Sequence, residues 1–118
     1  MKKFLVVLLL AAGGWAQAAP QEPAPRCDLT ISFGSYAAGI DAPALAAVRR
    51  ILADRAVRSV EVTNWGPEGE TYLCARTRRP SDARRLFSRI RNVLPAVPRG
   101  PIAVRTASGL RFDAPRPR

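Results

Sequence analysis

The chain has 118 residues, of which 19 are Lys or Arg, nine are Asp or Glu and none is His, so its formal net charge at pH 7 is +10. This length allows one small domain with a single modest core. The absence of histidine removes the usual general base and the commonest metal ligand, and two cysteines are too few for a tetrahedral zinc site. The composition therefore predicts a non-enzymatic protein with no metal and no cofactor.

Residues 1–18 have the pattern of a secretory signal peptide. Two lysines precede an apolar run from Phe4 to Ala12, and Ala16-Gln17-Ala18 has the small residues of a cleavage site. The apolar run is far shorter than the ~20 residues that a membrane-spanning helix needs, and no later stretch is apolar enough to span a bilayer. We therefore expect a mature chain of 100 residues, without a membrane span, in the bacterial periplasm or outside the cell.

The two cysteines, Cys27 and Cys74, both belong to the mature chain. Export to an oxidising compartment predicts one disulfide bond between them. That bond would close a loop of about 47 residues and contribute roughly 2–4 kcal/mol to stability. The alternative is a pair of unrelated buried thiols.

The mature chain begins with a segment that has no apolar period. Residues 19–26 contain three prolines and are expected to form a flexible lead-in. Leu29, Ile31 and Phe33 then alternate with polar residues, which predicts a strand with one buried face. After a loop, Asp41-Ala42-Pro43 has the acidic and proline residues that favour the start of a helix, and an apolar stripe continues to about Arg55.

The rest of the chain is expected to form a hairpin, a second helix and one or two further strands. Residues 57–65 and 71–77 read as two strands joined by a Gly/Pro turn, which is typical of a hairpin. A second helix is expected from Pro80, with Ser81 as N-cap, until Pro95. Residues 102–106 form another strand, and a short final strand at Leu110 and Phe112 is possible after a turn. Residues 114–118 are expected to be a disordered basic tail, which leaves 27–113 as the folded domain.

The order β-α-β-β-α-β predicts an α+β fold. Each helix has a single apolar stripe, so both are expected on one face of an antiparallel sheet. We expect a ferredoxin-like two-layer sandwich with strand order 4-1-3-2. Strands one and three would then be neighbours, which brings Cys27 near Cys74. However, Cys27 is in phase with Leu29, on the expected core face of its strand, whereas Cys74 is in phase with Tyr72, on the expected outer face of its strand. A disulfide bond across the two strands needs both cysteines on one face. Either Tyr72 and Cys74 face the core, or Cys27 precedes the regular pleat, and the sequence does not decide between them.

Arginines gather on and before the second helix, where they would form a basic ridge. Arginine suits the recognition of carboxylates and phosphates, so this surface is a candidate contact for an anionic partner. The alternative is a solvated helix face in an arginine-rich chain. The outward residues of the sheet would be Thr30, Ser32, Glu61 and Thr63, which offer no stacking platform, and this argues against nucleic acid. The candidate contact residues are Arg76, Arg78, Arg79, Arg84, Arg85, Arg89, Arg91 and Trp65.

The hairpin turn carries three residues of interest. Trp65 precedes the turn and either caps the end of the sheet or contacts a partner. Glu68 and Glu70 flank a glycine and could be taken for a carboxylate pair, but at a hairpin tip we expect them to be solvated.

The segments Leu29-Thr30-Ile31-Ser32-Phe33-Gly34-Ser35, Ala44-Leu45 and Val60-Glu61-Val62 resemble the opening of OmpA-like peptidoglycan-binding domains. The resemblance covers about a third of the chain. It implies a second possible function, peptidoglycan binding, in which Arg84 or Arg85 would stand in for the ligand-binding arginine of the family. The Gly-His-Thr-Asp segment of that family has no counterpart here.

The sequence therefore predicts a small exported binding domain with one disulfide bond. Its partner would be another protein or an anionic component of the cell envelope.

Overall fold

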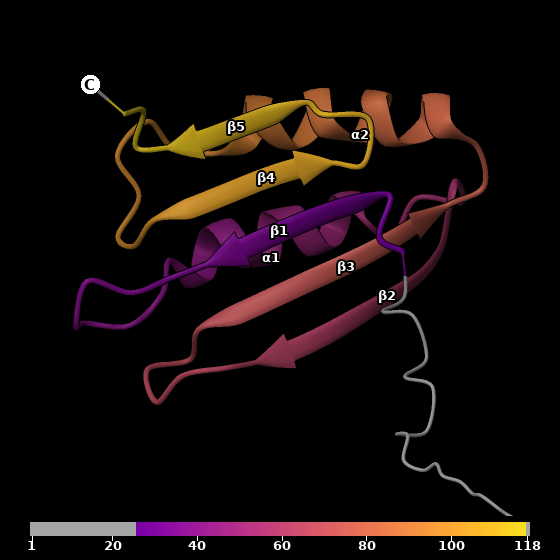
Figure 1. Cartoon of the computed structure of the whole chain (residues 1–118). Coiled ribbons are helices and arrows are strands. Elements are labelled where there is room, and N and C mark those ends of the chain that lie inside the picture. Colours follow the sequence, from indigo (N-terminus) through magenta and orange to yellow (C-terminus); the bar gives the residue numbers. More distant parts are fainter. Residues whose placement is uncertain (1–25, 118) are drawn as a thin grey trace, which may run out of the picture.

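The computed structural model describes residues 26–117 as a five-stranded antiparallel sheet with two helices behind it in the view of Figure 1. The predicted signal peptide, 1–18, and the predicted lead-in apart from Arg26 lie outside the described residues. The elements in chain order are β1 (Leu29–Phe33), α1 (Ala42–Ile51), β2 (Val57–Asn64), β3 (Thr71–Thr77), α2 (Pro80–Val93), β4 (Ile102–Thr106) and β5 (Arg111–Ala114).

Strand β1 lies in the middle of the sheet, between β3 and β4. Because side chains alternate across a strand, Leu29, Ile31 and Phe33 all point toward the helices, and each has no exposed surface. Thr30 and Ser32 point to the opposite side, which neither helix of residues 26–117 covers (Figure 1). Below we call that side the open face.

Helix α1 begins where the sequence predicts. The side chain of Asp41 accepts a hydrogen bond from the backbone N–H of Ala44 at 3.1 Å, and Pro43 occupies the first turn. The helix ends at Ile51, about one turn before the predicted end at Arg55. The chain leaves the helix through a tight turn, in which the carboxylate of Asp54 accepts the N–H of Ala56 at 2.8 Å.

The start of helix α2 corrects one prediction. Its N-cap is Arg79 and not Ser81, and Arg79 makes no side-chain capping bond. Arg79 has an extended backbone, with φ −140° and ψ 151°, because the residue before a proline is sterically disfavoured from helical geometry. Pro80 is therefore the first helical residue. The apolar stripe of α2 is buried as expected, through Ala83, Leu86, Phe87 and Ile90.

The α+β class and the antiparallel sheet are confirmed. The strand order is β2-β3-β1-β4-β5, so a fifth strand extends the sheet beyond β4, and the four-stranded ferredoxin-like topology is not confirmed. Strand β5 runs through Ala114, which pairs with Ile102 and is only 2% exposed. The folded domain thus extends one residue into the segment that the sequence assigned to the tail.

The predicted disulfide bond between Cys27 and Cys74 is present, with the two Cα atoms 5.2 Å apart. Cys74 is paired with Thr30 of β1 and therefore lies on the open face. Cys27 comes before β1 begins at Leu29, so it is not bound by the alternation of that strand. This resolves the phase conflict: Cys27 precedes the regular pleat, and Tyr72 and Cys74 do not face the core.

We expect the double variant Cys27→Ser/Cys74→Ser to have a free energy of unfolding about 2–4 kcal/mol lower than that of the oxidised chain, because its unfolded state is no longer cross-linked. Urea denaturation followed by circular dichroism measures this difference. A reductant should bring the unsubstituted chain to the stability of the variant and leave the variant unchanged. Equal stability of the two chains under oxidising conditions would contradict the expectation.

Candidate functional site

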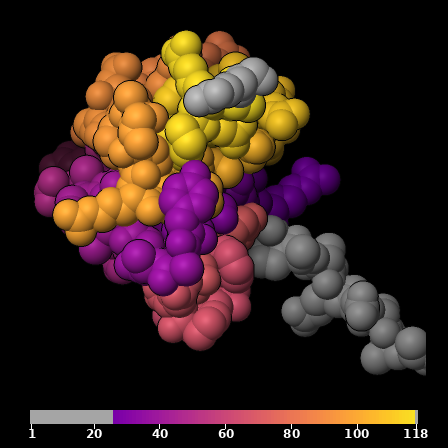
Figure 2. Space-filling view, turned by 90° about the vertical axis from the view of Figure 1, so that its left-hand side faces the viewer, coloured from indigo at the N-terminus to yellow at the C-terminus, as the bar shows by residue number. Residues whose placement is uncertain are grey.

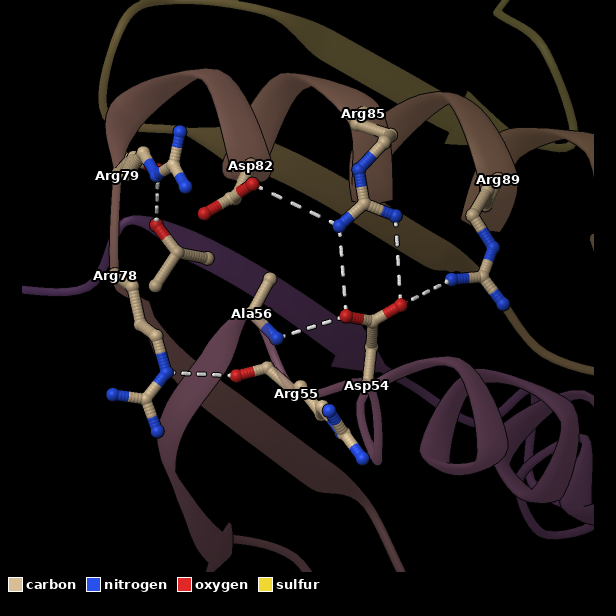
Figure 3. A network of polar contacts seen from close by, with 9 residues as sticks. Asp54, Arg55, Ala56, Arg78, Arg79, Asp82, Arg85 and Arg89 are labelled. Carbon is tan, nitrogen blue, oxygen red and sulfur yellow. Dashed lines mark hydrogen bonds and ion pairs between the residues drawn. The ribbon is translucent and has the colours of Figure 1, made fainter.

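The structure divides the predicted basic ridge into separate groups. Arg85 and Arg89 of α2 both reach Asp54, which follows α1 (Figure 3). Arg89 lies 2.9 Å from the carboxylate and Arg85 lies 3.5 Å from it, and Arg85 also lies 3.7 Å from Asp82. These two arginines therefore join α2 to the end of α1.

Asp54 is held in its ionised form. The backbone N–H of Ala56, and after it the guanidinium of Arg85, lower the pKa of Asp54 below its ordinary value, and Arg89 acts in the same direction. A carboxylate with a lowered pKa accepts hydrogen bonds at neutral pH and has no proton to give. Asp54 thus serves as an anchor for arginines.

The other arginines of the predicted ridge lie elsewhere. Arg84 and Arg91 are seven residues apart and share a different side of α2, where the guanidinium of Arg91 lies 5.5 Å from the ring centroid of Phe112 in β5. Arg76 belongs to β3, where it is paired with Ser59 and points to the open face. The arginines of the predicted ridge therefore lie on several surfaces, and their contact with an anionic partner stays a prediction.

A compact basic site exists instead at the junction of β3 and α2. We call it the arginine hollow: a shallow depression of about 310 Å³ lined by Asp54, Arg55, Ala56, Arg78, Arg79, Asp82 and Arg85. Arg55, Arg78 and Arg79 take part in none of the ion pairs found among residues 26–117. Arg78 is positioned by a hydrogen bond from its Nε to the carbonyl of Arg55 at 2.8 Å (Figure 3).

Arg55 was missed by the sequence analysis. The sequence predicts it at the end of a helix, whereas it lies in the turn between α1 and β2, beside the arginines that precede α2. Arg55 lies close to Arg78 and Arg79 because the chain passes from α1 into the β2–β3 hairpin, which returns to the same end of the sheet. No local pattern in the sequence indicates it.

The opposite end of the sheet is built from connecting segments, and Figure 2 shows this end from outside. The loop 34–41 after β1, the turn 65–70 between β2 and β3, and the segment 94–101 before β4 meet there. The hydroxyl of Ser35 accepts the backbone N–H groups of Ala37 and Gly39 and donates to the carboxylate of Glu68, each at 2.9 Å. Asp41 accepts the backbone N–H of Arg99 at 3.0 Å. Side chains therefore join all three segments.

A residue of the hairpin turn itself, Glu70, holds the backbone of the turn in place. Glu70 is only 8% exposed, which corrects the prediction that it is a solvated residue. Its carboxylate accepts the backbone N–H of Glu68 at 2.7 Å and lies over Gly66, where any Cβ would collide with it. Its carbonyl accepts the backbone N–H of Trp65 at 3.1 Å. Glu70 thus fixes the backbone on both sides of the turn.

Trp65 lies in this braced region with 56% of its surface exposed. Together with Tyr36, which is 58% exposed, it lines a groove of about 330 Å³. We call this the aromatic groove. It is lined by Ser32, Gly34, Tyr36, Trp65, Pro101, Ile102, Ala103, Asp113, Ala114 and Pro115.

The open face also has an aromatic residue that the sequence analysis did not place there. Tyr72 is paired with Ser32 on one side and Thr63 on the other, and it is 37% exposed. The four predicted outward residues, Thr30, Ser32, Glu61 and Thr63, thus share the open face with one aromatic residue. The signal in the sequence is the strand phase that Tyr72 shares with Cys74, which by itself does not show which face the two residues occupy.

Comparisons with protein families, with curated proteins and with solved structures found no match for this chain. The resemblance to OmpA-like domains rests on the quoted residues alone, and Arg85, one of its two candidate arginines, is bound to Asp54 and Asp82. Within residues 26–117, no three side chains of the metal-ligating types come together. Neither helix of that range is long and apolar enough to cross a membrane.

We expect Asp54→Asn to lower the Tm at pH 7, because the variant loses the charge that holds Arg85 and Arg89 while its amide oxygen still accepts the N–H of Ala56. The folded-state pKa of Asp54 is lowered, so its stabilisation is present above the ordinary pKa of 3.8 and is lost as the pH falls through the folded-state value. Melting curves from neutral pH down to about pH 2 should show the gap in Tm closing. Asp82→Asn is the control and should have a smaller effect, since its contact with Arg85 is longer. A gap of constant size across the pH range would contradict this account.

Proposed function

We propose that the protein is an exported, disulfide-bonded domain that binds an anionic partner, either a protein or a component of the bacterial cell envelope, through the arginine hollow. The observation that carries this proposal is the set of Arg55, Arg78 and Arg79, which are exposed on one small surface and take part in no ion pair of the described residues.

The geometry of the hollow favours an anion. A guanidinium presents a planar fork of N–H donors that matches a carboxylate or a phosphate. Arg85 is already held by Asp54 and Asp82, so one wall of the hollow is ordered before a partner arrives. The overall positive charge of the chain would also speed the approach of an anionic partner, in a salt-dependent way.

Two features support a location outside the cytoplasm. The leader has the pattern of a secretory signal, and Cys27 and Cys74 form a disulfide bond, which persists in oxidising compartments. We place the protein in the periplasm or outside the cell on these grounds.

The two carboxylates that line the arginine hollow, Asp54 and Asp82, favour a binding role over a catalytic one. Asp54 and Asp82 are both engaged by arginines, and the pKa of Asp54 is lowered rather than raised toward neutrality. A general acid needs the opposite shift.

The fold itself supports a relation to ferredoxin-like sandwiches. Strands β1 and β2 are both antiparallel to β3, and β3 and β4 are both antiparallel to β1, so each helix connects two parallel strands that flank a third. We propose a ferredoxin-like sandwich that β5 extends at one edge.

A pair of charge-matched variants tests the proposed site. Arg78→Ala/Arg79→Ala removes two arginines from the hollow, and Arg84→Ala/Arg111→Ala removes two exposed arginines outside it. On a sulfated polysaccharide column, we expect the first variant to elute at clearly lower salt than the second, because a specific anion contact depends on position as well as on charge. Melting curves of both variants confirm that they are folded. Equal elution of the two variants would show that net charge alone causes the binding and would overturn the proposal.

A further inference from the structure

We propose that the aromatic groove is a second binding site, and that it takes a neutral saccharide, which stacks on Trp65 and Tyr36. This site is separate from the arginine hollow. The groove lies where β1 ends, β4 begins and β5 ends, whereas the hollow lies where β3 ends and α2 begins.

Two exposed aromatic side chains from different parts of the chain meet at this groove. Tyr36 comes from the loop after β1, and Trp65, 29 residues later, is the first residue of the turn after β2. Each has more than half of its surface exposed, although tryptophan is usually highly buried. Large aromatic side chains in adjacent exposed positions are typical of contact sites, because they offer a wide apolar surface and lose little conformational entropy on binding.

The backbone that carries these side chains is held firmly. Ser35, the neighbour of Tyr36, is bonded to two backbone N–H groups of its own loop and to Glu68 of the hairpin turn. The backbone N–H of Trp65 donates to the carbonyl of Glu70, and the carboxylate of Glu70 closes the turn. Such bracing fixes the backbone from which the two side chains extend, and so reduces the backbone entropy lost when a ligand binds.

A close backbone approach adds to this rigidity. The N–H of Gly34 donates to the carbonyl of Pro101 at 2.8 Å, and a Cβ on Gly100 would collide with the carbonyl of Gly34. The loop after β1 and the segment before β4 therefore contact each other directly beneath the groove. A binding site built on such a support keeps its shape.

The charge of the groove selects a neutral ligand. Asp113 is its one ionisable lining residue besides the tyrosine, and its carboxylate lies 3.0 Å from the guanidinium of Arg105. The positive charge of Arg105 therefore neutralises the negative charge of Asp113. An anionic ligand would gain nothing from the groove itself, in contrast to the arginine hollow.

The remaining lining groups suit a saccharide better than a peptide. Ser32 and Asp113 provide a hydroxyl and a carboxylate that can bond to sugar hydroxyls, while the rings of Trp65 and Tyr36 can cover the apolar C–H face of a pyranose. A peptide that paired with the groove as an added strand would need backbone N–H donors along it for its carbonyls. Pro101 and Pro115, which line the groove, have none.

Calorimetric titration of the exported product with two neutral saccharides, an N-acetylglucosamine tetramer and maltotetraose, tests the proposal. We expect saturable binding of at least one of them. Trp65→Ala should weaken this binding at least tenfold and Tyr36→Ala severalfold, while Trp65→Phe, which keeps an aromatic ring, should retain most of it. Leu110→Ala is the control, because Leu110 is partly exposed in the turn at the other end of the sheet and should leave the affinity unchanged.

The remaining outcomes separate this proposal from the proposed function. Arg78→Ala/Arg79→Ala should leave saccharide binding unchanged. Anion binding by the hollow and saccharide binding by the groove can therefore be disproved independently. Melting curves identify any variant that fails to fold, and Trp65→Phe and Tyr36→Ala then carry the test. The proposal is overturned if neither saccharide binds up to about 10 mM, if Leu110→Ala weakens binding as much as Trp65→Ala, or if only a proline-rich peptide or a sulfated saccharide binds in a manner that depends on Trp65.

Discussion

The disulfide bond between Cys27 and Cys74 holds the start of β1 against β3, and the rest of the sheet is arranged around β1. Asp28, the residue after Cys27, extends this attachment. Its backbone N–H donates to the carbonyl of Ala75 at 2.9 Å, its carbonyl accepts the N–H of Ala107 at 3.1 Å, and its carboxylate accepts the N–H of Thr77 at 2.8 Å. The central strand is thus fixed to both neighbours before its first buried side chain. In a domain this small, one cross-link of this kind is a large share of the net stability.

From β1 outward, the two faces of the sheet have different roles. The face that carries Leu29, Ile31 and Phe33 forms one core with α1 and α2. The open face carries the disulfide bond and Tyr72, and it leads to the aromatic groove where β1 ends. The arginine hollow forms at the other end of β3, where α2 begins and the chain also turns from α1 into β2. The two candidate sites are therefore consequences of the same sheet: each uses the segments that connect strands at one of its ends.

Local patterns in the sequence predicted much of this fold. Alternation located β3 at Thr71–Thr77 and β4 at Ile102–Thr106, the bounds that the structure has. Asp41 and Pro43 located the start of α1. These predictions succeeded because alternation and helix-start residues act over a few positions. The N-cap of α2 failed within that same range, because the extended geometry that Pro80 imposes on Arg79 outweighed the capping preference of Ser81.

The candidate sites were harder to predict because they depend on contacts between distant segments. Ser35 and Glu68 are 33 positions apart, and Asp41 and Arg99 are 58 positions apart, so no local pattern indicates their hydrogen bonds. The division of the arginines around Asp54 has the same cause, because Arg85 and Arg89 are 31 and 35 positions away from it. The strand phase of Tyr72 was visible in the sequence, but only the register of β3 against β1 shows which face it occupies.

The central claim is that the chain folds with β1 joined to β3 through a disulfide bond between Cys27 and Cys74. Peptide mapping by mass spectrometry, on the native chain digested without reduction, tests this claim most directly. The account predicts one cross-linked pair of peptides, one with Cys27 and one with Cys74, which separates into two peptides after reduction. Two peptides with free thiols in the unreduced native chain would contradict it.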